Sequence, residues 1–419
     1  MEERKRRRPE LDEGPAHASP KLPRREEEDF FSWPAEITLK ILLHAIQPPS
    51  SSHTRRTSRA TLPAPHEINF IVCGFVCRQW KDLLPTPAVR ISPEVFTAAL
   101  ARLGYLSLLQ WARGNNCGWD KKVCLSAAEG GHLELLKWAR ENGCQWNPYV
   151  MCSYAVSGGN IELLKWVRER ECPWSAEVCP NAASNGHLEL LKWARAEGCS
   201  WDEYSCNGAA SGGHLEMLKW LRENGCPWNR FTCTFAAREG HLEVLKWARE
   251  HGCPWNNSTC SNAAETGHLE VLKWAREHGC PWGLDCAPAA AGGGHLELLK
   301  WAVENGCPLT EETCARAARW GHFEVLKWLR ENECPWNVDV CAYAAKRGDL
   351  EMLIWARENG CDWEQNTCNY AAREGHFEVL KWAVENGCPF DENVCQSAVR
   401  GDHFEVLQNE RVIRKSFNG

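Results

Sequence analysis

The chain has 419 residues, of which 44% are hydrophobic and 25% are charged, and its formal net charge is −7. This negative balance argues against a general nucleic-acid binder, and no run reaches the roughly 18 apolar residues of a membrane helix. The N-terminus is also too charged for a secretory signal. We therefore expect an intracellular protein, in the cytoplasm, the nucleus or both, with no nucleic-acid or membrane partner.

Residues 1–29 have the composition of a disordered charged tail. They hold eight basic and nine acidic residues together with four prolines, and such a segment cannot bury enough apolar surface to fold. The basic run from Arg4 to Arg8 has two interpretations that remain open. It is either a nuclear import signal or part of a solvated tail whose charges balance.

Residues 30–88 contain two predicted helical stretches around an insert at 47–66 that is rich in Pro, Ser and Thr and is expected to be a disordered loop. The first stretch begins with Pro34 and places Ile37, Ile41 and Leu42 on one helical face. A helical segment of fewer than about 60 residues is marginal alone. Part of its apolar surface therefore needs a partner, which is either another protein or the first repeat of the array that follows.

The same segment resembles an F-box, whose core reads L-P-x-E-I-x-x-x-I-L and, after a gap, V-C-R-x-W-x-x-L. This chain reads W-P-A-E-I at 33–37, I-L at 41–42 and V-C-R-Q-W at 76–80, so Trp33 replaces the usual Leu and the gap is longer. The resemblance implies docking onto the small adaptor of cullin–RING ubiquitin ligases. The implied adaptor contacts are Trp33, Pro34, Ile37, Ile41, Leu42, Val76, Cys77 and Trp80.

Residues 92–410 are predicted to form twelve repeats. A G-H-L-E-type motif recurs every 27 residues, apart from one step of 28 between His132 and Asn160. This repetition accounts for the unusual 24 Cys and 23 Trp. Eleven Trp occupy one slot, nine occupy a second slot, and every Cys except Cys73 and Cys77 belongs to eleven C-x6-C-like pairs, one per repeat.

Each repeat is predicted to be two antiparallel helices. Leu242, Val244 and Leu245 mark the apolar face of a second helix, and an Ala-Ala pair at 236–237 marks the small face of a first helix. One such unit is too small to fold alone, so its apolar faces must be shared with its neighbours. The predicted fold class is an all-α solenoid of stacked helix pairs, followed by a tail at 411–419.

The string AAREGHLEVLKWAREHGCPWN at 236–256 resembles the ankyrin repeat, whose consensus contains A-A-x-x-G-H-x-E-V-V-K. The resemblance implies a protein-binding array. Each unit is shorter than the family's repeat, and the residues that it lacks fall where the family has its β-hairpin finger. We therefore expect helices without full fingers. We also expect a monomer.

Three recurring residue types have competing interpretations. Cys residues spaced C-x6-C do not fit the C-x2–4-C of common zinc sites, and free Cys is a frequent core residue, so a buried core is favoured over redox chemistry and metal binding. The His of the motif occurs nine times, which favours a structural bond to backbone over catalysis. The Trp slots correspond to core positions, which favours packing over base stacking. We therefore expect no enzyme activity, no metal and no cofactor.

Recognition by a solenoid is expected where the repeats differ. These positions are the two residues before each Ala-Ala pair, the two residues after it, and the loop after C-P-W. In the later repeats they hold cations and aromatic residues, both of which are enriched in binding hot spots. The predicted target-binding residues are Arg238, Arg316, Arg319, Trp320, Tyr343, Lys346, Arg347, Tyr370 and Arg373. They suit an acidic or phosphorylated segment, and the alternative is an ordinary solvated face. The functional prediction is a substrate receptor of a ubiquitin ligase; the alternative is an ankyrin-type scaffold with no ubiquitin role.

Overall fold

The computed structural model describes residues 93–114 and 116–403. The chain divides into two compact units, Met1–Phe96 and Thr97–Gly419, and the second unit holds the repeats. The predicted tail at 1–29, the F-box-like segment at 30–88 with its insert, and the tail at 411–419 all lie outside the described residues.

The described residues fold into helices and contain no strand. The first helices of the repeats are α4 (Pro93–Arg102), α6 (Lys121–Glu129), α8 (Pro148–Ser157), α10 (Val178–Ser184), α12 (Glu203–Gly212), α14 (Arg230–Arg238), α16 (Asn257–Glu265), α18 (Cys286–Gly293), α20 (Glu311–Trp320), α22 (Asp339–Arg347), α24 (Gln365–Arg373) and α26 (Glu392–Arg400). The second helices are α5 (Leu106–Gly114), α7 (Leu133–Glu141), α9 (Ile161–Arg168), α11 (Leu188–Ala196), α13 (Leu215–Glu223), α15 (Leu242–Glu250), α17 (Leu269–Glu277), α19 (Leu296–Glu304), α21 (Phe323–Glu331), α23 (Leu350–Glu358) and α25 (Phe377–Glu385). The predicted fold class of stacked helix pairs is confirmed.

Local sequence signals set where the helices begin and end. Asp202 precedes α12 in an extended conformation and accepts a hydrogen bond from the backbone N–H of Tyr204, and Asn229 does the same for α14. These side chains satisfy N–H groups that have no partner within the helix. At the other end, Gly252 follows α15 with a φ of +83°, where glycine has no steric penalty.

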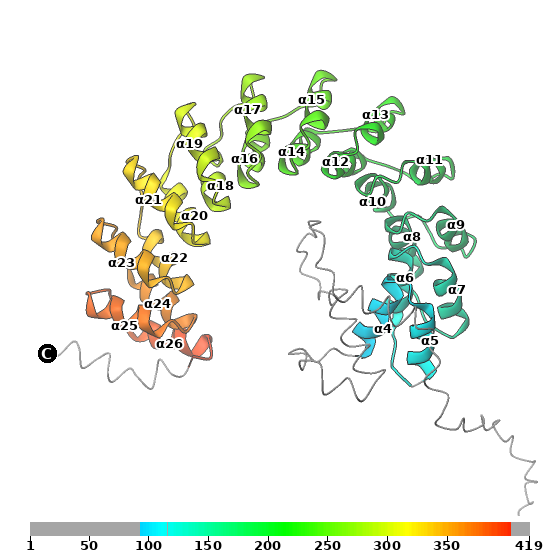
Figure 1. The fold of residues 1–419 in the computed structure, drawn as a ribbon, viewed down its shortest axis with the longest axis horizontal. Coiled ribbons are helices and arrows are strands. Elements are labelled where there is room, and N and C mark those ends of the chain that lie inside the picture. Colours follow the sequence, from blue (N-terminus) through cyan, green and yellow to red (C-terminus); the bar gives the residue numbers. More distant parts are fainter. Residues whose placement is uncertain (1–92, 115, 404–419) are drawn as a thin grey trace, which may run out of the picture. The chain divides into compact units, whose positions relative to one another are not determined.

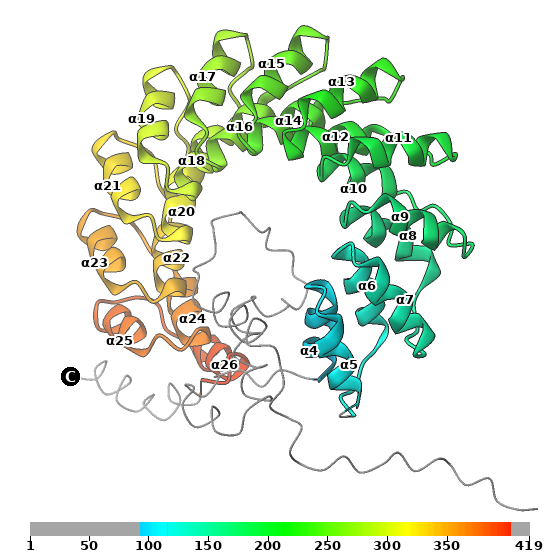
Figure 2. The same cartoon turned by 45° about the vertical axis from the view of Figure 1, so that its right-hand side comes forward.

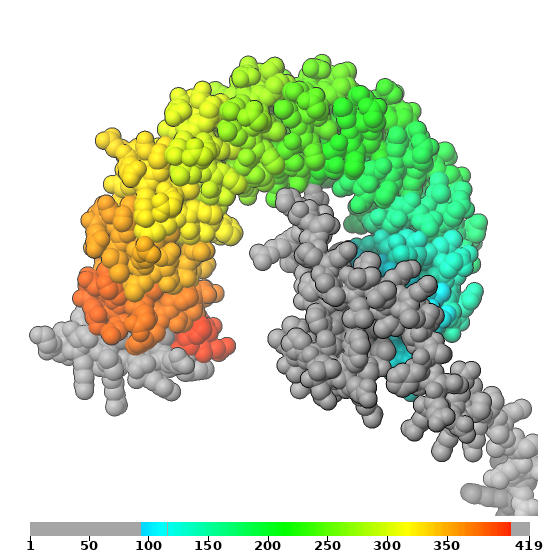
Figure 3. Space-filling model, viewed as in Figure 1, coloured from blue at the N-terminus to red at the C-terminus, as the bar shows by residue number. Residues whose placement is uncertain are grey.

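The two rows of helices pack differently. Successive first helices from α6 to α26 pack on one another, so that α12, for example, contacts both α10 and α14, and the small Ala-Ala faces are fully buried there. Second helices carry Trp side chains and make fewer contacts with one another. Close packing on one side and wider spacing on the other bends the repeat unit, with the first helices on its inner side (Figures 1 and 2). The repeats of this unit pack against one another without a break along the array (Figure 3).

The core runs through the repeats as one layer of aliphatic side chains, alanines and thiols. Leu218, Leu245 and Leu272 are fully buried, as are nearly all of the described cysteines, and every described cysteine is unbridged. The prediction of a thiol core is confirmed for these residues. Cys117 and Cys395, in the first and last described repeats, are only half-buried.

The cysteines do not pair as their spacing suggests. C-x6-C spacing groups the Cys that ends one repeat with the Cys of the next first helix. In the structure, the Cys of a first helix instead meets the Cys about 20 residues later, at the end of the same repeat, as Cys152 does with Cys172 and Cys206 with Cys226. The Sγ atoms of Cys179 and Cys199, for example, lie 3.3 Å apart. Spacing along the chain misleads here because the second helix folds back and returns the chain to the start of its own repeat.

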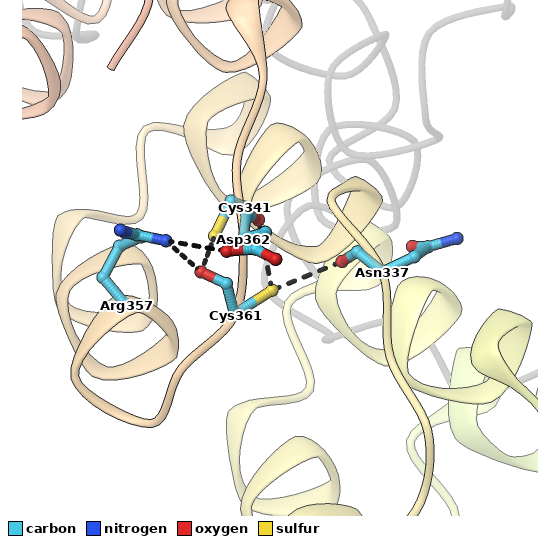
Figure 4. A network of polar contacts seen from close by, with 5 residues as sticks. All are labelled: Asn337, Cys341, Arg357, Cys361 and Asp362. Atoms are coloured by element: carbon cyan, nitrogen blue, oxygen red, sulfur yellow. Dashed lines mark hydrogen bonds and ion pairs between the residues drawn. The ribbon is translucent and has the colours of Figure 1, made fainter. Parts of the chain in front are cut away.

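Figure 4 shows the polar contacts of these thiols at the beginning and end of one repeat. The Cys361 thiol donates to the carbonyl oxygen of Asn337 over 3.3 Å, and the Cys341 thiol lies 4.0 Å from the carbonyl oxygen of Cys361. Arg357 donates a hydrogen bond to the same Cys361 carbonyl and lies 3.9 Å from the Asp362 carboxylate. The thiols thus act as weak donors to backbone at the point where the repeat begins and ends.

The indoles lie at the edge of the core. In the repeats of residues 116–403, the Trp side chains of both slots are half-buried. Trp228 meets Trp247 of the next repeat edge to face, with ring centroids 6.0 Å apart, and the Arg222 guanidinium lies over the Trp228 ring at 4.2 Å. The same arrangement recurs in most repeats. The indoles therefore link neighbouring repeats with aromatic and cation–π contacts.

Candidate functional site

The recurring histidines hold neighbouring repeats together. His241 Nε2 lies 3.2 Å from the carbonyl oxygen of Ser211 in the preceding repeat. A carbonyl only accepts, so the imidazole carries its proton on Nε2. The ring also lies against Gly213, where an added Cβ would come within 2.6 Å of it. His214 and His322 make the same contact with Ser184 and Gly292, which confirms the structural interpretation of these histidines.

These half-buried imidazoles predict that the fold weakens in mild acid. Burial lowers the pKa of His214 and of His268 below the ordinary value of 6.5. The unfolded chain therefore takes up these protons first as the pH falls. The stability that these two histidines contribute is fully present above about pH 7 and is lost as the pH falls through the ordinary histidine range. We expect the urea midpoint to be lower at pH 5.5 than at pH 7.5.

A matched variant isolates this effect. Asn160 occupies the His position in another repeat and its Nδ2 donates to the Gly131 carbonyl over 3.0 Å, so the double variant His214→Asn/His268→Asn should keep the contact without titrating. Its midpoint should change less between the two pH values than that of the unmodified chain. An identical change in both proteins would contradict the prediction.

No group of three or more His, Cys, Asp or Glu side chains in the described part of the chain is arranged to hold a metal ion. The thiols and imidazoles instead make contacts that hold the repeats together, and we call the residues with this role the structural frame. The variable positions at the C-terminal ends of the first helices are therefore the candidate binding surface.

Eight of the nine predicted target-binding residues lie on three neighbouring first helices, α20, α22 and α24, which pack side by side. They are Arg316, Arg319 and Trp320 on α20, Tyr343, Lys346 and Arg347 on α22, and Tyr370 and Arg373 on α24. Arg319, Lys346, Arg347 and Arg373 are exposed, the two tyrosines are half-buried, and Trp320 is 56% exposed. The structure thus brings these eight residues together on one surface.

Cations and aromatic rings alternate across this surface. The Arg319 guanidinium lies 5.6 Å from the Tyr343 ring centroid in the next repeat and 5.8 Å from that of Trp320. Lys346 Nζ lies 5.5 Å from the Tyr370 ring centroid in the repeat after that. These contacts restrict long side chains while their charges stay accessible.

Two of the eight residues have other contacts. Arg316 forms an ion pair with Glu312 on its own helix, with 3.0 Å between Nε and Oε1. The Arg347 guanidinium lies against Gly321, at the place a histidine ring takes in other repeats, because the motif histidine of its own repeat is replaced by Asp349. These two residues contribute to the frame as well as to the surface.

Arg238 is separated from this surface. It ends α14, and the equivalent positions of α16 and α18, which lie between α14 and α20, are Glu265 and Gly292. The three equivalents that directly precede Arg238 are neutral: Ser157, Ser184 and Ser211. The predicted set is therefore one contiguous surface plus one isolated residue.

Sequence reasoning missed a fourth cation at the same place. Arg400 ends α26, is exposed, and follows Arg319, Lys346 and Arg373 at intervals of 27 residues. We call these four residues the cation row. Arg400 follows Ala-Val rather than Ala-Ala at 398–399, which hid it from a search for residues after Ala-Ala, whereas counting the repeat period would have found it.

The predicted adaptor contacts, from Trp33 to Trp80, lie outside the described residues. The structure therefore places none of Trp33, Pro34, Ile37, Ile41, Leu42, Val76, Cys77 or Trp80.

None of the helices among the described residues is long and apolar enough to cross a membrane.

Comparison with known proteins gives one family match. A family model described as ankyrin repeats in many copies matches residues 209–249, and no curated protein matches the sequence. The crystal structure of the human ASB11 ankyrin repeat domain aligns with 38% of this chain and 84% of its own, at 18% identity and a TM-score of 0.32. The pentatricopeptide repeat protein PPR10, crystallised with an 18-nucleotide psaJ RNA element, aligns with 91% of this chain and 63% of its own, at 13% identity and a TM-score of 0.36.

The family match covers one repeat junction, from the Ala-Ala pair of α12 to the second helix α15. The helix pairs on both sides of it share the 27-residue period and the same inter-repeat contacts. Repeats of this kind present extended surfaces to protein partners. The described part of the chain is an all-helical solenoid, and residues 209–249 of it are similar to ankyrin repeats.

Proposed function

We propose that this protein is a substrate-receptor subunit of a cullin–RING ubiquitin ligase. Segment 30–88 binds the ligase adaptor, and the repeats bind a target protein. The observation that carries the proposal is the presence in one chain of the motifs P-A-E-I and V-C-R-Q-W and a solenoid with an exposed binding surface. Catalysis by proximity explains why such a chain needs no reactive residues of its own, since it holds the target close to a charged ubiquitin-conjugating enzyme.

The target-binding half of the proposal draws support from the surface chemistry. The elements that recur in most repeats are used in packing: the histidine on backbone, the thiols in the core and the indoles between repeats. Trp320, by contrast, exposes 56% of its surface beside exposed cations. Exposed aromatic and arginine side chains that the fold does not need are typical of binding hot spots.

Adaptor binding is tested by co-purification of the full chain with a recombinant adaptor. The double variant Val76→Ala/Trp80→Ala should weaken adaptor binding at least about thirtyfold, because truncating a buried hot-spot side chain costs about 2 kcal/mol or more. Target capture should persist, since the repeats are unchanged.

The matched control is Tyr149→Ala, which removes an aromatic side chain that is 71% exposed on α8 and has no assigned role. It should leave adaptor binding unchanged. A full chain that fails to bind the adaptor at high concentration would contradict the proposal and favour an ankyrin-type scaffold with no ubiquitin role. In that case segment 30–88 would cap the first repeat, and its deletion would lower the stability of the array.

A further inference from the structure

We infer that the cation row binds an extended acidic protein segment whose carboxylates are spaced three residues apart. The row consists of Arg319, Lys346, Arg373 and Arg400, one from each of four consecutive first helices. This inference rests on the proposed role of the repeats in binding a target, and it names the chemistry of the bound segment. It is independent of the adaptor, which is assigned to another part of the chain.

The fold does not require cations at these positions. A cation at the C-terminal end of a helix gains a little from the helix dipole, but the equivalent positions in other repeats are Glu129, Ser184 and Gly292. These repeats have the same helix pairs and the same packing. Four cations in successive repeats are therefore a property of the surface at this end of the repeat unit.

The four charges are available to a partner. Within residues 93–114 and 116–403, none of the cation row is in an ion pair, whereas the nearby Arg316 is bonded to Glu312. All four side chains are exposed. Tyr343 and Tyr370 lie against Arg319 and Lys346, so two of the cations are partly ordered before any ligand binds, which lowers the entropy that binding costs.

The spacing of the row sets the spacing of its ligand. The helices α20, α22, α24 and α26 follow one another along the repeat unit (Figure 2). Packed helices lie about 8–10 Å apart, so successive cations should be displaced by about 10 Å. An extended chain advances about 3.3 Å per residue, so three residues span one repeat. Acidic residues at i, i+3, i+6 and i+9 therefore meet one cation each.

Single carboxylates suit this row because most of its repeats offer one unpaired cation. Arg and carboxylate groups form charge-assisted hydrogen bonds, in a bidentate form where geometry allows. The first helices lie on the inner, curved side of the repeat unit, which an extended segment can follow and a stiff helix cannot. Trp320, on the first helix of the row, offers an apolar contact beside Arg319.

The test measures binding of fluorescent peptides to the full chain by anisotropy. One twelve-residue peptide carries four Glu spaced by three among Ser and Ala, and a second peptide of the same composition carries the four Glu in succession. The spaced peptide should bind at least tenfold more tightly at moderate salt, and its affinity should fall as salt rises. Equal binding of the two peptides would overturn the inference, because only general attraction would remain.

Charge reversal locates the site. The triple variant Arg319→Glu/Lys346→Glu/Arg373→Glu should weaken binding of the spaced peptide at least 100-fold. The control Lys121→Glu/Lys122→Glu/Arg230→Glu makes the same change in net charge at exposed positions on α6 and α14, and it should reduce binding less than threefold. Equal losses in the two variants would contradict the assignment to the cation row.

Two further measurements separate the remaining outcomes. If circular dichroism shows that the reversed variant is misfolded, the variant Arg319→Gln/Lys346→Gln/Arg373→Gln tests the same charges and should weaken binding at least tenfold.

Single-stranded RNA of matched length competes with the spaced peptide for the full chain in a second measurement. If it binds the row more tightly than the spaced peptide, the ligand is a nucleic acid and the inference is wrong. Adaptor binding should be unchanged in every variant, so its loss or retention judges the proposed function separately.

Discussion

Replacing Gly213 by alanine should lower the free energy of unfolding by about 3 kcal/mol. Gly213 ends α12 with a φ of +75°, and an L-residue in this left-handed conformation costs about 1–2 kcal/mol. The added Cβ would also lie 2.6 Å from the His241 ring of the next repeat. Moving that ring breaks its hydrogen bond to the Ser211 carbonyl, which costs about 1 kcal/mol more. Urea unfolding followed by circular dichroism measures the sum.

Gly225 provides a control within the same repeat. Its φ of +78° is nearly the same, but an added Cβ would meet no atom within 4 Å. The equivalent positions in two other repeats are Glu171 and Glu333, with φ values of +58° and +56°, so the backbone tolerates a side chain there. Gly225→Ala should therefore cost only about 1 kcal/mol.

A double-variant cycle ties the difference to the ring. In the His241→Ala background, Gly213→Ala should cost about as much as Gly225→Ala, because the clash and the hydrogen bond are both gone. If Gly213→Ala costs the same with and without the imidazole, the histidine does not hold the two repeats together.

Replacing Leu245 by alanine should lower the free energy of unfolding by about 3–4 kcal/mol. Leu245 lies on α15 and is completely buried, and Leu→Ala changes in such sites cost about 2–5 kcal/mol because they remove apolar contact and leave a cavity. The repeat cannot easily close this cavity, since its first helix is held on both sides by neighbouring first helices. Repeats depend on their neighbours, so the loss should spread beyond α15.

The control for this change is Glu243→Ala on the same helix. Glu243 forms an ion pair with Lys246 over 2.7 Å, and its side chain is 74% exposed. Exposed pairs of this kind contribute less than about 1 kcal/mol. Equal effects of the two substitutions on the urea midpoint would contradict the assignment of the core to the Leu245 face.

The functional surface and the structural frame use different parts of each repeat. The frame takes up the residues that recur, so changes such as Gly213→Ala should destabilise the array without a specific effect on ligand spacing. The cation row occupies positions that vary between repeats, so reversing its charges should alter binding with little effect on folding. Measuring both stability and peptide binding in each variant separates these two roles.

The periodic part of the fold was predictable from the sequence. The 27-residue step, the Leu242–Ala248 face and the Ala-Ala pair predict stacked helix pairs, and the structure has them. The structural role of the histidine was predictable as well, because a side chain that recurs in most repeats is poorly suited to a unique catalytic task. Regular patterns of this kind are local, so secondary structure and burial follow from them directly.

Contacts between residues far apart in the chain were decided only by tertiary structure. Cys179 meets Cys199 because the second helix folds back, and the C-x6-C spacing indicated a different partner. The indoles lie half-buried between repeats because cation–π contacts hold them at the edge of the core.

The binding surface was predictable in its chemistry and not in its extent. The sequence by itself determined the repeat period, the helix pairs and the basic, aromatic character of the later repeats. Only the tertiary structure assigned Arg316 and Arg347 partly to the frame and left the side chains of Arg319, Lys346, Arg373 and Arg400 exposed. The physical reason is that residue type and period are properties of the chain, whereas the neighbours and free charges of a side chain depend on how successive repeats pack.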